Sequence, residues 1–157
     1  MSPYDWLLFL HVAGAFLLLG GTVLAGLFTF FAVRRERPSE VALLLGLIRI
    51  GVIAIMAGSL LTLVLGLWLV HDAGYGYGDG WVVAAIVLWV VGNAAGEAGG
   101  RRLDKTRTLA GELAAQGDAP SLELRARIRA PLPLVLSYGS GLVILTVLAL
   151  MIWKPGA

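Results

Sequence analysis

Four long apolar segments dominate this chain of 157 residues and leave little sequence for anything else. They cover residues 4–33, 41–70, 81–100 and 132–153, and each reaches the roughly 18–20 residues that a helix needs to cross a hydrocarbon core of about 30 Å. Charged residues make up only 14% of the chain, well below the roughly 25% of a soluble domain. We therefore predict one all-α membrane domain over residues 1–157, with no room for a soluble enzyme domain.

The basic residues predict how the helices are oriented in the membrane. Eleven of the twelve Lys and Arg residues lie at positions 34–49 and 101–129, and Lys154 is the other one. Basic loops stay in the cytoplasm, and the apolar segments carry Trp at their opposite ends, where indole favours the interface: Trp6, Trp68, Trp81 and Trp153. We predict a multi-pass protein of the bacterial inner membrane, an up-down four-helix bundle with both termini outside.

The loop over residues 101–130 is the largest part expected outside the membrane. We predict a modest helix over 103–116, a break at 117–120, and a short interfacial helix capped by Ser121. Residues 122–130 alternate apolar and polar side chains as a strand does, but a lone strand has no pairing partner here. Ser39, just after a proline, is the expected N-cap of the second span.

The arginines of these loops are expected to contact anionic lipid headgroups, at about 1 kcal/mol each. Nucleic-acid binding is the other interpretation of a basic loop, but the membrane topology already accounts for the charge, so we expect no nucleic-acid partner.

Small residues recur every four positions on two of the spans. Gly58, Thr62 and Gly66 do so on the second span, and Gly92, Gly96 and Gly100 on the third. This spacing lets helix backbones approach closely inside a membrane, so we predict that these residues pack helices together. The same residues can also line a cavity for a substrate or cofactor.

Polar groups at membrane depth are rare and therefore candidates for function. Arg49 and Glu97 are expected at similar depths near the inner interface, where they could pair, with Asn93 one turn away completing a polar network. The alternative is that both charged side chains extend to the cytoplasmic interface, with Glu97 reaching Arg101 four residues on.

His11 lies about 7 Å inward of Trp6, among small residues of the first span. It is a candidate axial ligand of haem b, because an imidazole in a four-helix bundle can hold that cofactor. His71 is a weaker candidate at a different depth, and a purely structural histidine is the alternative. The chain has no cysteine, which excludes disulfides and thiolate sites, and we identify no catalytic residues and no metal site.

Several runs resemble a known family. Residues 4–15 (YDWLLFLHVAGA), 58–66 (GSLLTLVLG) and 77–81 (YGDGW) are similar to a group of small bacterial four-span proteins described as predicted integral membrane proteins of unknown function. More distantly, Leu10-His11 before a small-residue helix resembles the copper-resistance D proteins and the membrane protoporphyrinogen oxidase. That second resemblance implies haem at the first-helix histidine.

Three functions follow as hypotheses. The first is a non-enzymatic structural or accessory module, which forms a homo-oligomer or packs against a larger membrane complex through its glycine faces. The second is a haem- or quinone-associated redox protein that uses His11. The third is a small oligomeric channel or transporter. It has the least support of the three, because the spans contain no chain of proton-relay carboxylates.

Overall fold

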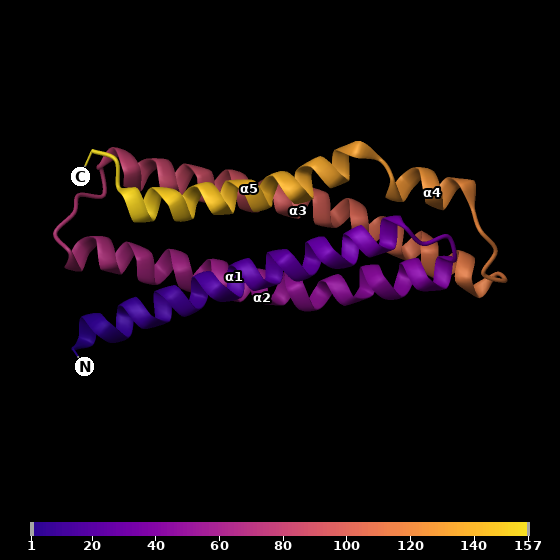
Figure 1. The fold of residues 1–157 in the computed structure, drawn as a ribbon, viewed down its shortest axis with the longest axis horizontal. Coiled ribbons are helices and arrows are strands. Elements are labelled where there is room, and N and C mark those ends of the chain that lie inside the picture. The colour runs from indigo at the N-terminus through magenta and orange to yellow at the C-terminus, as the bar shows by residue number, and fades with distance from the viewer. Residues whose placement is uncertain (1, 157) are drawn as a thin grey trace.

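The computed structural model describes residues 2–156, and within them it contains helices but no strands (Figure 1). Four helical segments are long and apolar enough to cross a membrane, which confirms the predicted all-α four-helix membrane bundle. The helices are α1 (Pro3–Val33), α2 (Pro38–Asp72), α3 (Gly80–Ala115), α4 (Leu122–Ile128) and α5 (Pro131–Trp153).

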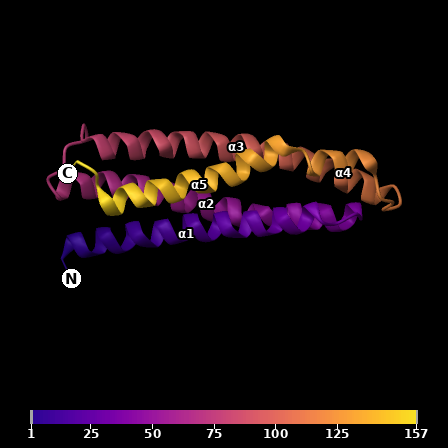
Figure 2. The ribbon, with the colours of Figure 1, turned by 45° about the horizontal axis from the view of Figure 1, so that its top comes forward.

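The bundle consists of two antiparallel hairpins, α1 with α2 and α3 with α5 (Figures 1 and 2). Both termini and the α2–α3 turn lie at one end, which we call the Trp end because Trp6, Trp68, Trp81 and Trp153 lie toward it. The α1–α2 turn, the last part of α3 and the whole of α4 lie at the opposite end, which we call the Arg end.

Glycines bring the backbones of α1 and α2 into contact. A methyl group at Gly58 would lie 2.4 Å from the Leu18 amide nitrogen, and one at Gly51 would lie 2.7 Å from the Gly21 carbonyl oxygen. Neither position can accept a side chain unless a helix moves. No hydrophobic force drives helices together in lipid, so this close approach and the dispersion contacts it allows hold the first hairpin together.

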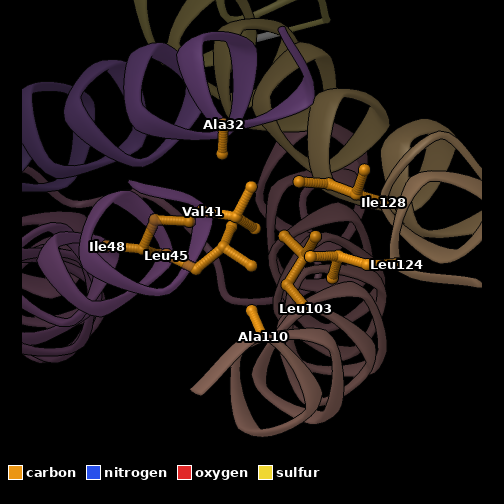
Figure 3. Packing of buried hydrophobic residues seen from close by; sticks show 8 residues of the cluster. All are labelled: Ala32, Val41, Leu45, Ile48, Leu103, Ala110, Leu124 and Ile128. Atoms are coloured by element: carbon orange, nitrogen blue, oxygen red, sulfur yellow. The ribbon is translucent and has the colours of Figure 1, made fainter. Parts of the chain in front are cut away.

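A hydrophobic core joins the two hairpins at the Arg end (Figure 3). Its buried side chains come from α1, α2, α3 and α4, and they are Ala32, Val41, Leu45, Ile48, Leu103, Ala110, Leu124 and Ile128. The helix predicted over 103–116 is therefore no separate element, because α3 continues unbroken to Ala115. No proline or paired glycine interrupts it after Gly100, and burial of Leu103 and Ala110 stabilises the extension.

Residues 122–128 form α4, so the helix predicted against their strand-like alternation is confirmed. The Ser121 hydroxyl accepts a hydrogen bond from the Leu124 amide at 3.4 Å, as expected of an N-cap. Leu124 and Ile128 are four residues apart, so both face the core from one side of the helix. The Arg125 guanidinium pairs with the Glu36 carboxylate of the α1–α2 turn, which further ties α4 to the first hairpin.

The prediction that Ser39 caps α2 is wrong, because α2 begins at Pro38 and its N-cap is Arg37, two residues before Ser39. The Ser39 amide and hydroxyl instead each donate a hydrogen bond of 2.7 Å to the carboxylate of Asp118, from the loop after α3. Asp118 thereby places a negative charge at the N-terminus of α2, where the helix dipole favours it. The side chain of Asp118, 79 positions away in the sequence, thus accepts a hydrogen bond from a backbone amide at the start of α2, as an N-cap side chain does.

This contact predicts an acid-sensitive link at the Arg end. The hydrogen bonds from Ser39 lower the pKa of the Asp118 carboxyl below its ordinary value of 3.8. A carboxyl whose pKa is lowered on folding adds stability above its unfolded pKa and loses that stability as pH falls through the folded pKa. We expect amide exchange at Ser39 to be faster in Asp118→Asn than in the wild type at pH 7, and the difference to disappear at low pH, once the Asp118 carboxyl is protonated below its ordinary pKa of 3.8. Asn also tolerates the left-handed backbone that Asp118 adopts, so a difference that persisted at low pH would contradict a role for the charge.

Candidate ligand cavity at the Trp end

Between the two hairpins lies a half-open cavity of about 480 Å³, in the half of the bundle nearer the Trp end. The core described above closes the Arg end, and a smaller buried cluster of Val70, Trp81 and Val82 joins α2 to α3 near the turn at the Trp end. All four long helices line the space between these two contacts. Its volume lies within the range of about 300–1,000 Å³ that is typical of small-molecule sites.

The cavity wall is predominantly apolar, with a few polar side chains among leucines, valines and alanines. Those polar or amphipathic side chains are Tyr4, His11, Thr62, Tyr75, Trp81, Trp89, Asn93 and Lys154. An apolar wall with a small number of placed polar groups is the usual composition of a site for a lipophilic molecule.

His11 lies in this wall because α2 leaves room for its ring. A methyl group at Gly66 would lie 2.9 Å from His11 Cε1 and 3.3 Å from His11 Nδ1, so the imidazole rests directly on the glycine. Nδ1 is completely buried there and makes no hydrogen bond of good geometry in the described chain, although the Thr62 backbone lies close to the ring. A ligand in the cavity can therefore approach only the other ring nitrogen, Nε2, without displacing the ring.

Hydrogen-bonding groups without partners gather around the cavity. Within residues 2–156, four buried side-chain atoms lack a hydrogen-bond partner, and each belongs to a residue of the cavity wall. They are His11 Nδ1, Thr62 Oγ1, Trp81 Nε1 and Trp89 Nε1. Burying a polar group without a partner is costly, and such groups are rare in folded proteins. Each of the four atoms is itself fully buried, so a molecule in the cavity would bond to it only after a side chain turns.

Asn93 fixes the register of the two hairpins at the deep end of the cavity. The Ser59 hydroxyl of α2 donates a hydrogen bond of 3.1 Å to Asn93 Oδ1, and Asn93 Nδ2 donates one of 2.8 Å to the Trp89 carbonyl oxygen. Asn93 therefore bonds across to α2 and back along its own helix. The structure does not join it to Glu97 or Arg49 in a polar network.

The structure does not bring Arg49 and Glu97 together. Glu97 pairs instead with Arg101 at 2.5 Å, and Arg49 is exposed and in no ion pair among the described residues. The Ser59–Asn93 contact gives the reason. In antiparallel helices with that register, Arg49 is level with Leu103, about 9 Å further toward the Arg end than Glu97.

The remaining predicted residues divide between the cavity and the helix contacts. His71 is exposed in the last turn of α2 and does not line the cavity, so it is not placed to share a ligand with His11. Thr62 faces Gly14 of α1, and Gly92 and Gly96 face Val143 and Ser140 of α5. Gly58, described above, lies on the same face of α2 as Thr62. Within residues 2–156, no three His, Cys, Asp or Glu side chains are grouped closely enough to hold a metal ion.

Sequence reasoning missed two residues of the cavity, Trp89 and Lys154. Trp89 lies in the middle of an apolar run, far from the interface where Trp is usually found, and that position was the available signal. Lys154 is the one basic residue outside the two clusters, but nothing in the sequence placed it beside the α2–α3 turn and the start of α3.

Together, the fold and the cavity define a small four-helix membrane protein with a ligand-sized space between two helix hairpins. The chain belongs to the family described as "Predicted integral membrane protein (DUF2269)", which it matches over residues 5–155. This match confirms the resemblance to the four-span proteins of unknown function. Neither the curated proteins nor the solved structures contain a match to the chain. The more distant resemblance to the copper-resistance D proteins stays a prediction.

Proposed function

We propose that this protein is a non-enzymatic membrane module that holds one largely apolar small molecule between its two hairpins. The observation that carries this proposal is the cavity itself, a ligand-sized space with an apolar wall that includes the ring of His11. The apolar body of such a molecule contacts the apolar side chains of the wall. Its few polar atoms, or water bound with it, form hydrogen bonds with the polar side chains.

The packing of the glycines favours this role over a purely accessory one. An accessory subunit was expected to contact a larger complex through its glycine faces, but Gly58, Gly92 and Gly96 are already covered inside the bundle. Contacts with a larger complex or with a second copy would therefore have to use other surfaces of the bundle. Packing against a partner also gives no reason for a cavity between the two hairpins.

Haem b and a quinone are the two ligand classes that His11 would suit. His11 Nε2 would hold the haem iron, and Met151, Tyr4 and Tyr75 are further cavity residues that bear an iron-binding atom. Haem would supply one-electron chemistry when bound. For a quinone, the same nitrogen would exchange a hydrogen bond with a ring carbonyl oxygen.

We also propose that the Trp end faces the outside of the bacterial inner membrane and the Arg end the cytoplasm. The distribution of basic residues supports this orientation, since eleven of twelve lie toward the Arg end. Arg127 and Arg129 would then lie beside anionic headgroups of the inner leaflet.

A cavity-filling variant tests the proposed function. Ala15 lines the cavity, so Ala15→Phe places a bulky ring where the ligand would lie, whereas Ala57→Phe adds the same ring to an exposed position of α2. We expect wild type and Ala57→Phe, purified in mild detergent, to retain an apolar molecule that organic extraction and mass spectrometry identify, and Ala15→Phe to lose it. Equal retention by all three proteins, or retention by none, would overturn the proposal.

The visible absorption spectrum distinguishes the two ligand classes. Haem bound through His11 gives a Soret band in protein from haem-replete cells, and His11→Ala abolishes that band. A quinone gives no Soret band, and His11→Ala then lowers the amount of quinone extracted with the protein. A Soret band that His11→Ala leaves unchanged would contradict ligation by this residue.

A further inference from the structure

Lys154 stands apart from every other basic residue of the chain. It is the one Lys or Arg at the Trp end, and it lies in the wall of the cavity. Its side chain is half-buried, and the Nζ atom lies 4.8 Å from the centre of the Tyr75 ring and 5.9 Å from that of Trp81. The Tyr75 hydroxyl is its hydrogen-bond partner, at 3.5 Å.

No carboxylate neutralises this ammonium group within the described chain. The Trp end has three acidic residues: Asp5 accepts from the Ser2 amide, Asp79 accepts from the Gly76 amide in the α2–α3 turn, and Asp72 forms no ion pair with Lys154. The aromatic rings attract the cation but leave it without a counter-ion. A partly desolvated cation without a counter-ion makes the cavity mouth a favourable place for an anion.

The backbone holds Lys154 at this position in an uncommon conformation. Its φ of 39° is in the left-handed region, which few residues other than glycine adopt. Lys154 ends α5 there, and its amide donates to the Leu150 carbonyl oxygen at 2.9 Å. The chain thus turns at the end of α5 with the lysine side chain over the Tyr75–Trp81 pair rather than continuing away from the bundle.

We infer that the cavity takes an amphiphile whose acidic head, a carboxylate or a phosphate, binds Lys154 at the Trp end while its apolar body fills the space between the hairpins. This inference rests on the proposed function and names the chemistry of its ligand. His11 rests on Gly66, four residues before Val70, so it lies about 6 Å deeper than the Lys154 site and contacts the body of the ligand. Haem b, which carries carboxylates, meets this requirement, and a simple quinone does not.

Native mass spectrometry with oleate and methyl oleate tests the inference, because the two molecules differ only in the charged head. Loss of a charge-assisted hydrogen bond weakens binding roughly tenfold, so we expect the purified wild-type protein to bind oleate about tenfold more tightly than the ester. Lys154→Met should reduce oleate binding to the level of the ester and leave the ester unchanged. Lys154→Arg should retain the preference, and Lys154→Gln provides a second neutral variant if Lys154→Met folds poorly.

The cavity-filling pair separates failure of this inference from failure of the proposed function. If Ala15→Phe blocks both molecules but Lys154→Met changes neither, the cavity binds apolar ligands and the inference about the acidic head is overturned. If Ala15→Phe and Ala57→Phe bind both molecules as well as the wild type does, the cavity is not the site and the proposed function fails too.

The acidic head could belong to a free fatty acid or to a membrane lipid, and a further comparison distinguishes them. Phosphatidylglycerol that displaces oleate from the wild type, and that Ala15→Phe no longer binds, identifies a lipid phosphate as the head and supports the inference. Phosphatidylglycerol binding that depends on Lys154 but not on Ala15 would show that the lysine is only an interfacial anchor, which would overturn it.

Discussion

Gly58→Ala is expected to destabilise the protein by about 2 kcal/mol or more, because overpacking a well-packed contact typically costs 1–3 kcal/mol. The added methyl would lie 2.4 Å from the Leu18 amide nitrogen and 2.5 Å from the Gly14 carbonyl oxygen. Both are backbone atoms of α1, so no side-chain rotation relieves the clash and the two helices must move apart. Unfolding in a graded mixture of mild detergent and SDS, followed by circular dichroism, measures the loss.

Gly46→Ala is the matched control, since Gly46 lies in the same helix and a methyl group there meets nothing within 4 Å. Alanine favours a helix over glycine by roughly 0.5–1 kcal/mol, so this variant should be as stable as the wild type or slightly more so. Equal losses in the two variants would mean that glycine is needed at these positions for a reason other than contact between α1 and α2.

The second large effect is expected at the Arg end, where Ile128→Ala should cost about 2–4 kcal/mol, within the range measured for buried Ile to Ala changes. Ile128 is 2% exposed and contacts the core that joins α4 to the rest of the bundle (Figure 3). Loss of this side chain leaves a space that the neighbouring helices cannot close without separating from other contacts. We expect α4 to detach first, so that trypsin cleaves sooner at Arg125 and Arg127.

Leu122→Ala in the same helix is the comparison for this experiment. Leu122 is 84% exposed, so its loss removes little buried area and should change neither the stability nor the rate of cleavage. If Leu122→Ala and Ile128→Ala accelerated cleavage equally, α4 would be held by its backbone and ion pairs rather than by the core.

Most of the fold could be predicted because its determinants are local and strong. Twenty apolar residues in a row form a helix in lipid whatever surrounds them, since the backbone has no other way to satisfy its hydrogen bonds. The short connections then make neighbouring helices antiparallel. The exception was the Arg end, where α3 continues past Gly100 because Leu103 and Ala110 are buried against other helices. The local sequence indicates a helix over 103–116, but not the burial that makes it continuous with the third span.

The candidate site could be predicted only in part. His11 was recognisable because an ionisable side chain in an apolar segment is costly and therefore rare. The pairing expected for Arg49 and Glu97 depended on placing each residue by its distance from a tryptophan. A tryptophan marks the membrane interface only to within about one helical turn. An offset of about 9 Å along the bundle is enough to keep the Arg49 and Glu97 side chains from pairing.

The sequence by itself determined the number of spans, the glycines that bring helices close, and the asymmetry between a Trp end and an Arg end, because each follows from how one segment interacts with lipid or water. Only the tertiary structure decided that the hairpins meet at both ends and leave a cavity between them. That outcome depends on the register of α2 against α3, set by the Ser59–Asn93 contact, and on side chains of all four long helices. It also brought together His11, Trp89 and Lys154, which are far apart in the chain, and no pattern within one helix encodes their meeting.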